Sequence, residues 1–111
     1  MKTLPPEALS AVAAYLRVLA EPTRLRILTL LNDGERSVGD IALGCGTSTP
    51  NASRHLALMT RHGLLARRMR GVTVLYGIAD PTIYALCDLV CVNVARQLET
   101  AQRTHAALTA A

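Results

Sequence analysis

The stretch STPNASRHLALMTRHGLL, residues Ser48–Leu65, carries the pattern that decides the fold. Ser48 or Thr49 can cap a helix, and Pro50 suits the first turn because the N–H that proline lacks would have no partner there. Gly63 marks the end of the helix. Between these signals, apolar residues recur at helical spacing, namely Ala52, Leu56 and Met59. We therefore predict a helix over about residues 49–61 with one buried face and one polar face.

A shorter helix is expected just before this one, over residues 37–43. Ser37 is a good N-cap for it. Its apolar residues are Val38, Ile41 and Ala42. A tight turn, Gly44-Cys45-Gly46-Thr47, then leads into the longer helix. Two helices joined by a turn that contains glycine predict a helix-turn-helix over about residues 37–61.

The period of the pattern changes after Gly63, where we expect a β-hairpin over about residues 64–79. Leu64–Met69 has the composition of a strand, and Arg70-Gly71 is a turn signal. The second strand alternates larger residues with small ones, at Val72, Val74, Tyr76 and Ile78. A basic hairpin directly after a helix-turn-helix is typical of the wing of a winged helix.

Three more helices complete the expected fold. Residues 6–20 and 22–31 form two helices separated by the break at Glu21-Pro22, and a last helix begins after Asp80 and covers about residues 81–105. The expected fold class is therefore mainly α with a small β-hairpin. It is a winged helix-turn-helix in a single domain over residues 1–111.

Length and composition narrow the function classes. The chain has 111 residues, half of them apolar and 18% charged, which is too hydrophobic for a disordered chain. No apolar run approaches the ~18–20 residues that cross a bilayer. The start of the chain lacks an apolar signal core, and three cysteines are too few for a disulfide scaffold. We expect a cytoplasmic protein with no membrane partner, whose thin aliphatic core leaves an apolar stripe for an oligomer.

The net charge of +4 is unevenly distributed. The 39 residues of Ile41–Ala79 contain five arginines and neither Asp nor Glu, hence +5. The rest of the chain has seven basic and eight acidic residues, hence −1. The basic block coincides with the second helix of the helix-turn-helix and with the hairpin. A polyanion is therefore the expected partner.

Three segments resemble the ArsR/SmtB family of bacterial repressors. They are LAEPTRLRILTLL (Leu19–Leu31), STPNASRHLALMTRHGLL (Ser48–Leu65) and VLYGIAD (Val74–Asp80), and the resemblance covers about residues 12–100. It implies a winged helix-turn-helix homodimer joined through its terminal helices. It also implies binding to a palindromic operator in double-stranded DNA, and release when a metal ion or another inducer binds.

The start of the helix over residues 49–61 has the chemistry that a major groove accepts, namely short hydroxyls and an arginine near backbone N–H groups. Similarity to the family places Thr49, Pro50, Ser53 and Arg54 on the groove-facing side. Ser48 could instead be only a cap, and His55 could point away. The expected DNA-binding residues are Ser48, Thr49, Pro50, Asn51, Ser53, Arg54 and His55, with Arg67, Arg68 and Arg70 of the wing contacting phosphate or the minor groove.

Cys87 and Cys91 form the candidate inducer site. Spacing of four puts both thiols on one face of the last helix, with Cβ atoms ~5–6 Å apart. Two thiolates at that separation can chelate one soft ion, such as Zn, Cd, Hg or Cu(I). By resemblance to the family, As(III) prefers three thiolates. The third would come from the other protomer or from Cys45, and no cofactor is expected to be required for folding.

Other interpretations of the two cysteines remain open. They lie within an apolar stripe and could simply pack a dimer seam. The stripe consists of Ile83, Leu86, Cys87, Val90, Cys91, Val94, Leu98 and Ala101. A persulfide or oxidant could link cysteines instead, although a direct disulfide within one helix is poorly directed. The chain could also have no inducer.

Two better-known sites of the family are not matched. The third expected helix, SVGDIAL, has no cysteine. Asp80 matches the first member of an Asp/His set, but Thr82, Asn93 and Arg96 occupy the positions where histidine ligands would be expected. A zinc site of histidine and carboxylate ligands is therefore disfavoured.

Three other function classes compete with a sequence-specific repressor. The chain has no Gly-rich phosphate loop, HExxH motif or nucleophile elbow, which argues against an enzyme. A protein-binding module would be monomeric in solution, with its apolar last helix reserved for a different protein. An architectural DNA binder would show little discrimination above its salt-dependent background.

Overall fold

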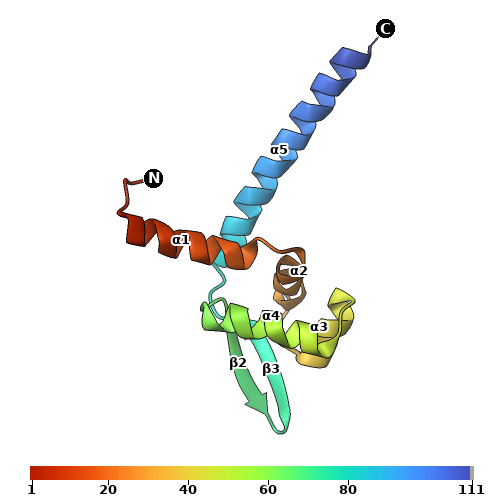
Figure 1. The fold of residues 1–111 in the computed structure, drawn as a ribbon. Coiled ribbons are helices and arrows are strands. Elements are labelled where there is room, and N and C mark those ends of the chain that lie inside the picture. The colour runs from red at the N-terminus through yellow and green to blue at the C-terminus, as the bar shows by residue number, and fades with distance from the viewer. Residues whose placement is uncertain (111) are drawn as a thin grey trace. The chain divides into compact units, whose positions relative to one another are not determined.

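The computed structural model describes residues 1–110, and five helices and three short strands follow one another in that range (Figure 1). They are α1 (Pro6–Leu19), α2 (Pro22–Leu31), β1 (Arg36–Ser37), α3 (Val38–Cys45), α4 (Thr49–Arg61), β2 (Leu65–Arg70), β3 (Thr73–Ile78) and α5 (Ile83–Thr109). The chain divides into two compact units, of which Met1–Asp80 is the first and the residues from Pro81 onward are the second. The predicted fold class, mainly α with a small hairpin, is confirmed.

Side-chain caps fix where the three middle helices begin. Glu21 accepts a hydrogen bond from the backbone N–H of Arg24 at 2.9 Å, which caps α2. Ser37 and Ser48 do the same for α3 and α4, each with its hydroxyl oxygen 3.2 Å from the backbone nitrogen three residues on. Each cap satisfies one of the N–H groups that a helix start leaves unpaired. The caps at Ser37 and Ser48 therefore fix the residues at which the two helices of the helix-turn-helix begin.

The wing belongs to a three-stranded antiparallel sheet with strand order β1-β3-β2. β2 and β3 pair from Leu65 with Ile78 to Arg70 with Thr73, and Gly71 turns the chain at a φ of +63°. β1 was not predicted, because two residues are too few to show an alternating pattern. It pairs with the other edge of β3, with Arg36 opposite Tyr76.

The core of the first unit lies where α2, α3 and α4 meet. α3 packs on α4, and α2 contacts both. The largest fully buried side chains are Ile27 of α2, Ile41 of α3, and Leu56 and Met59 of α4. Burying such a side chain stabilises the fold by roughly 1.5–3 kcal/mol. The buried face of α4 thus holds it in place and leaves its other face to the exterior.

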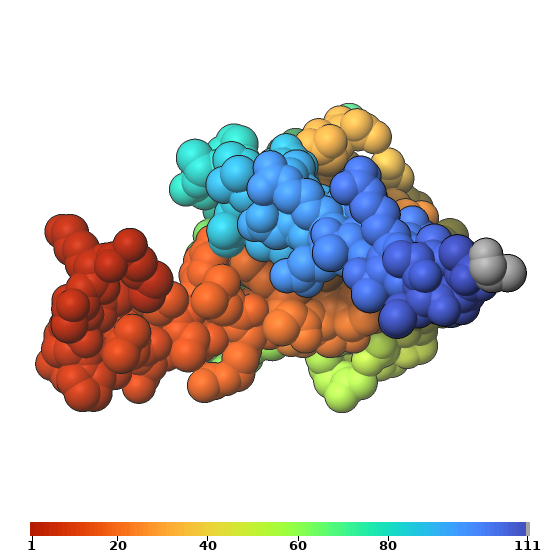
Figure 2. Space-filling model, turned by 90° about the horizontal axis from the view of Figure 1, so that it is seen from above, coloured from red at the N-terminus to blue at the C-terminus, as the bar shows by residue number. Residues whose placement is uncertain are grey.

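α5 is a single helix of 27 residues in which only Ile83 is buried. It ends at Thr109, four residues beyond the predicted end, because no Gly or Pro follows His105 to stop it. Figure 2 shows its side chains in blue tones. Large apolar residues lie exposed along it, namely Leu89, Val90, Val92, Val94, Leu98 and Leu108. No helix within residues 1–110 combines the length and apolar character that crossing a membrane requires.

Candidate nucleic-acid interface

The outer face of α4 presents small polar side chains and one arginine. Ala52, Leu56 and Met59 are buried on the inner face. Thr49, Pro50 and Arg54 are exposed, as is the capping Ser48, whereas Ser53 is half-buried. The structure therefore brings most of the predicted DNA-binding residues together around the first two turns of one helix.

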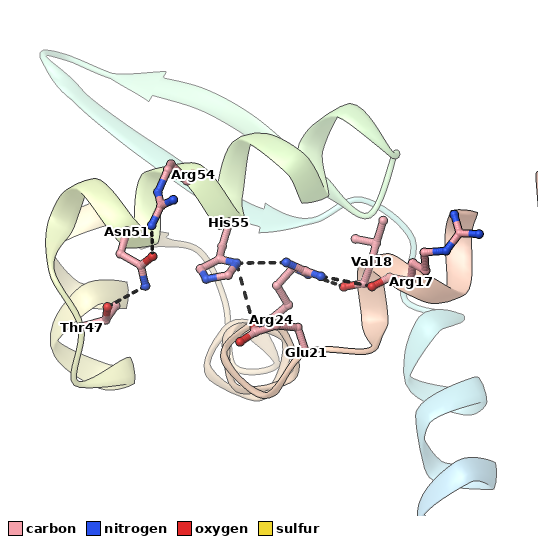
Figure 3. A network of polar contacts seen from close by, with 8 residues as sticks. All are labelled: Arg17, Val18, Glu21, Arg24, Thr47, Asn51, Arg54 and His55. Carbon is pink, nitrogen blue, oxygen red and sulfur yellow. Dashed lines mark hydrogen bonds and ion pairs between the residues drawn. The ribbon is translucent and has the colours of Figure 1, made fainter. Parts of the chain in front are cut away.

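A short chain of hydrogen bonds holds Arg54 on this face (Figure 3). Arg54 donates from its Nη2 to the side-chain oxygen of Asn51 at 2.5 Å. The side-chain nitrogen of Asn51 in turn donates to the hydroxyl oxygen of Thr47 at 2.8 Å. Both ends of the half-buried Asn51 amide are thus engaged within the protein. In the free protein Asn51 orients Arg54.

His55 lies on the other side of α4 and faces the start of α2 (Figure 3). Its Nδ1 accepts a hydrogen bond from Nη1 of Arg24 at 3.2 Å and lies 4.0 Å from a carboxylate oxygen of Glu21. The side chain is only 16% exposed. The predicted set of DNA contacts included His55, but this geometry gives it a contact within the protein instead.

Arg24 joins three helices through one side chain (Figure 3). Besides its bond to His55 of α4, it donates to the backbone oxygen of Val18 at 2.5 Å and to that of Arg17 at 3.1 Å. These carbonyls belong to the last turn of α1, where helices leave acceptors without an intrahelical donor. The Arg17 carbonyl also accepts from the backbone N–H of Ala20, at 3.2 Å. Sequence reasoning missed this role, because helical periodicity says nothing about a partner 31 residues away.

Arg24→Ala is expected to lower the free energy of unfolding by about 1–3 kcal/mol, because it removes the donor to the Val18 carbonyl and to the ring nitrogen of His55, and one of two donors to the Arg17 carbonyl. Urea unfolding at a fixed protein concentration measures the change. Arg26→Ala is the matched control, since Arg26 is exposed and its side-chain bond to the Gly44 oxygen is long, at 3.4 Å. Equal losses in the two variants would contradict the role given to Arg24.

The three wing arginines of β2 are not equivalent. Arg68 and Arg70 are two residues apart and share one face of the hairpin, whereas Arg67 points to the other. All three are exposed. The Nε of Arg68 donates to both carboxylate oxygens of Glu35, at 2.8 and 2.6 Å. This hydrogen bond lowers the pKa of the Glu35 carboxyl below its ordinary value, so the pair is ionised at neutral pH.

The three cysteines are free thiols in different surroundings. Cys45 is the half-buried last residue of α3 in the first unit, whereas half-buried Cys87 and exposed Cys91 lie one turn apart on α5 in the second. Burial raises the pKa of the Cys87 thiol, and Cys91 and Asp88 add to the effect. Within residues 1–110, no group of three or more His, Cys, Asp or Glu side chains is placed to hold a metal ion.

A polar helix face seated on a three-helix core and followed by a basic hairpin defines a DNA-binding domain of the winged helix-turn-helix class. A helix-turn-helix domain family matches residues 19–68. The regulator CmtR of Mycobacterium tuberculosis is 40% identical over 87 residues, which are 78% of this chain and 74% of CmtR. A probable mercury resistance operon repressor of Streptomyces lividans is 35% identical over 70% of this chain and 60% of its own length.

A solved structure shows the same fold. The homodimeric winged helix-turn-helix domain of Mb0332 from Mycobacterium bovis, a possible ArsR-family regulator, has a TM-score of 0.74 and 34% identity over 90% of this chain and 95% of that chain. The chain belongs to the ArsR/SmtB family of winged helix-turn-helix transcriptional regulators. It is a regulator and not an enzyme, as its sequence predicted.

Proposed function

We propose that this chain is a homodimeric repressor that binds a pseudo-palindromic operator and leaves it when a thiophilic species binds cysteines of α5. One observation gives the main support for the DNA-binding part of this proposal. The exposed polar face of α4 lies opposite its buried anchors, Leu56 and Met59, within a block of sequence that has no carboxylate. A rigid helix of this kind can enter a major groove without like-charge repulsion from phosphates.

The proposed contacts divide by their chemistry. Arg54, held by Asn51, is placed to read a guanine edge in the major groove. Arg67, Arg68 and Arg70 of the exposed hairpin are suited to phosphate or to the minor groove. Further contacts are proposed for Ser48, Thr49, Pro50 and Ser53. Asn51, whose amide bonds both Thr47 and Arg54, is proposed to act by orienting Arg54. Because His55 faces Arg24 and Glu21, we leave it out of the set.

The proposed dimer rests on apolar faces that the protomer leaves uncovered. In α1, Leu9, Val12 and Leu16 are exposed at helical spacing, and α5 exposes the apolar side chains named above. The Mb0332 domain is a homodimer, which favours a second copy of this chain as the occupant. A two-fold symmetric dimer reads two half-sites about one helical turn apart, about 10–10.5 base pairs centre to centre.

Selection from a random duplex pool is expected to recover an inverted repeat with that spacing, bound by a species of twice the chain mass in light scattering. Leu98→Glu should lower the dimer fraction and operator affinity, because it places a charge on the exposed apolar face of α5. Gln97→Glu, a neighbouring exposed position, is the control and should do neither. A monomeric wild-type protein, or a selected site without symmetry, would overturn the proposed dimer.

Cys87 and Cys91 are the proposed inducer ligands. The pair lies on the helix proposed to join the protomers, so a ligand there can alter the spacing of the two α4 helices. A mercury resistance repressor among the relatives supports a thiophilic metal. A third thiolate, as As(III) would need, would come from the partner subunit or from Cys45.

The surroundings of Cys87 favour a metal or metalloid over an oxidant. Because its pKa is raised, Cys87 is mostly a protonated thiol at neutral pH, and thiols react slowly with oxidants and reactive sulfur. A metal ion can displace the proton on binding. Reactive-sulfur sensing remains the second candidate function.

A further inference from the structure

The ion pair between Arg68 and Glu35 connects two segments that are far apart in the sequence. Glu35 directly precedes β1, and the register of β1 with β3 brings it to the edge of the sheet. Arg68 lies on β2, on the far side of β3. The carboxylate of Glu35 must therefore reach across β3 to accept both of its hydrogen bonds from Arg68.

Gly77 of β3 leaves room for this crossing. A Cβ atom on Gly77 would lie 2.9 Å from Cγ of Glu35, closer than real Cβ contacts allow. The φ angle of Gly77 is not positive, so the backbone does not require glycine there. The missing side chain is what allows Glu35 to lie flat against the sheet.

The ion pair between Arg68 and Glu35 is exposed enough for another anion to replace Glu35. It borders a surface depression of about 630 Å³ that is also lined by Ser37, Asp40, Arg70 and Thr73. The side chains of Arg68 and Glu35 are 56% and 37% exposed. An ion pair this exposed adds little to the stability of a fold. A phosphate of DNA could therefore replace the carboxylate on Arg68 without unfolding the wing.

We propose that Glu35 competes with DNA phosphate for Arg68 and so limits the affinity of the wing for any duplex. This inference rests on the proposed function. In the free protein, Glu35 neutralises one of the three wing arginines. When the wing meets DNA, Arg68 exchanges Glu35 for a phosphate, and the released carboxylate stays near the negatively charged backbone.

Glu35→Gln is expected to tighten binding to duplex DNA by roughly three- to tenfold at about 0.1 M salt, because Arg68 no longer has to leave a carboxylate, with little change in the dependence of log affinity on log salt, because Arg68 contacts a phosphate in both complexes. Operator and unrelated duplex should gain equally, because phosphate contacts do not read sequence. Fluorescence anisotropy over a salt series measures both quantities.

Asp33→Asn is the matched control, since it removes the same charge from an exposed residue two positions away. It should give a smaller gain. In the Arg68→Ala background, Glu35→Gln should gain no more than this control. Weaker or unchanged binding by Glu35→Gln, with wild-type binding intact, would show that the pair only braces the wing and would overturn the inference. Failure of the proposed function would appear differently, as the absence of operator selection by the wild-type protein.

Discussion

Arg54→Ala is expected to weaken binding to the selected operator by roughly ten- to hundredfold, corresponding to about 1–3 kcal/mol for the loss of one bidentate base contact. Binding to unrelated duplex should fall far less, so the ratio of operator affinity to unrelated-duplex affinity should decrease strongly. The fold should survive, because Arg54 is exposed and its hydrogen bond is to the neighbouring Asn51. Fluorescence anisotropy on operator and scrambled duplex gives the ratio, and circular dichroism checks the fold.

Arg61→Ala provides the control for charge. Arg61 is the exposed last residue of the same helix, and its loss removes the same charge far from the start of α4. Its effect should be small and equal on both duplexes. Tight, selective operator binding by Arg54→Ala would remove α4 from the reading role that we assign to it.

The second large effect is expected for the double variant Cys87→Ser/Cys91→Ser. Wild-type protein should leave its operator at near-stoichiometric As(III), Hg(II) or Cd(II), whereas the variant should stay bound at a concentration at least roughly tenfold higher, because hydroxyls are poor ligands for soft ions.

The metal concentration needed to release wild-type protein from its operator should also fall as pH rises. Metal must displace the proton from Cys87, whose pKa is raised by burial, and that displacement grows easier with pH.

Two further comparisons make this experiment decisive. Cys45→Ser tests the third ligand, since it should blunt the As(III) response only if Cys45 supplies a thiolate. A persulfide donor tests the second candidate function, and release by the donor alone would replace metal sensing with sulfur sensing. Equal release of wild type and double variant by every agent would remove Cys87 and Cys91 from the mechanism.

Local signals in the sequence were enough to predict the wing and the helix-turn-helix. The caps at Ser37 and Ser48 and the turn at Gly71 act within a few residues, so pattern and propensity reveal them. The contact between Arg68 and Glu35 could not be predicted, because it spans 33 residues and depends on the register of the two-residue β1. The orientation of His55 depends in the same way on Arg24, in another helix.

The long, almost uncovered α5 gives the proposed dimer a consequence for stability, which would then depend on the abundance of the regulator. A helix that buries one residue in 27 gains little from packing within its own chain, and packing of an apolar face is the main source of helix stability in proteins. If a twin covers its apolar side chains, mass action links folding to concentration, and the melting temperature rises with the amount of protein. Scarce protein would then be less folded as well as less able to occupy its operator, which sharpens the response of its target genes to the level of the regulator.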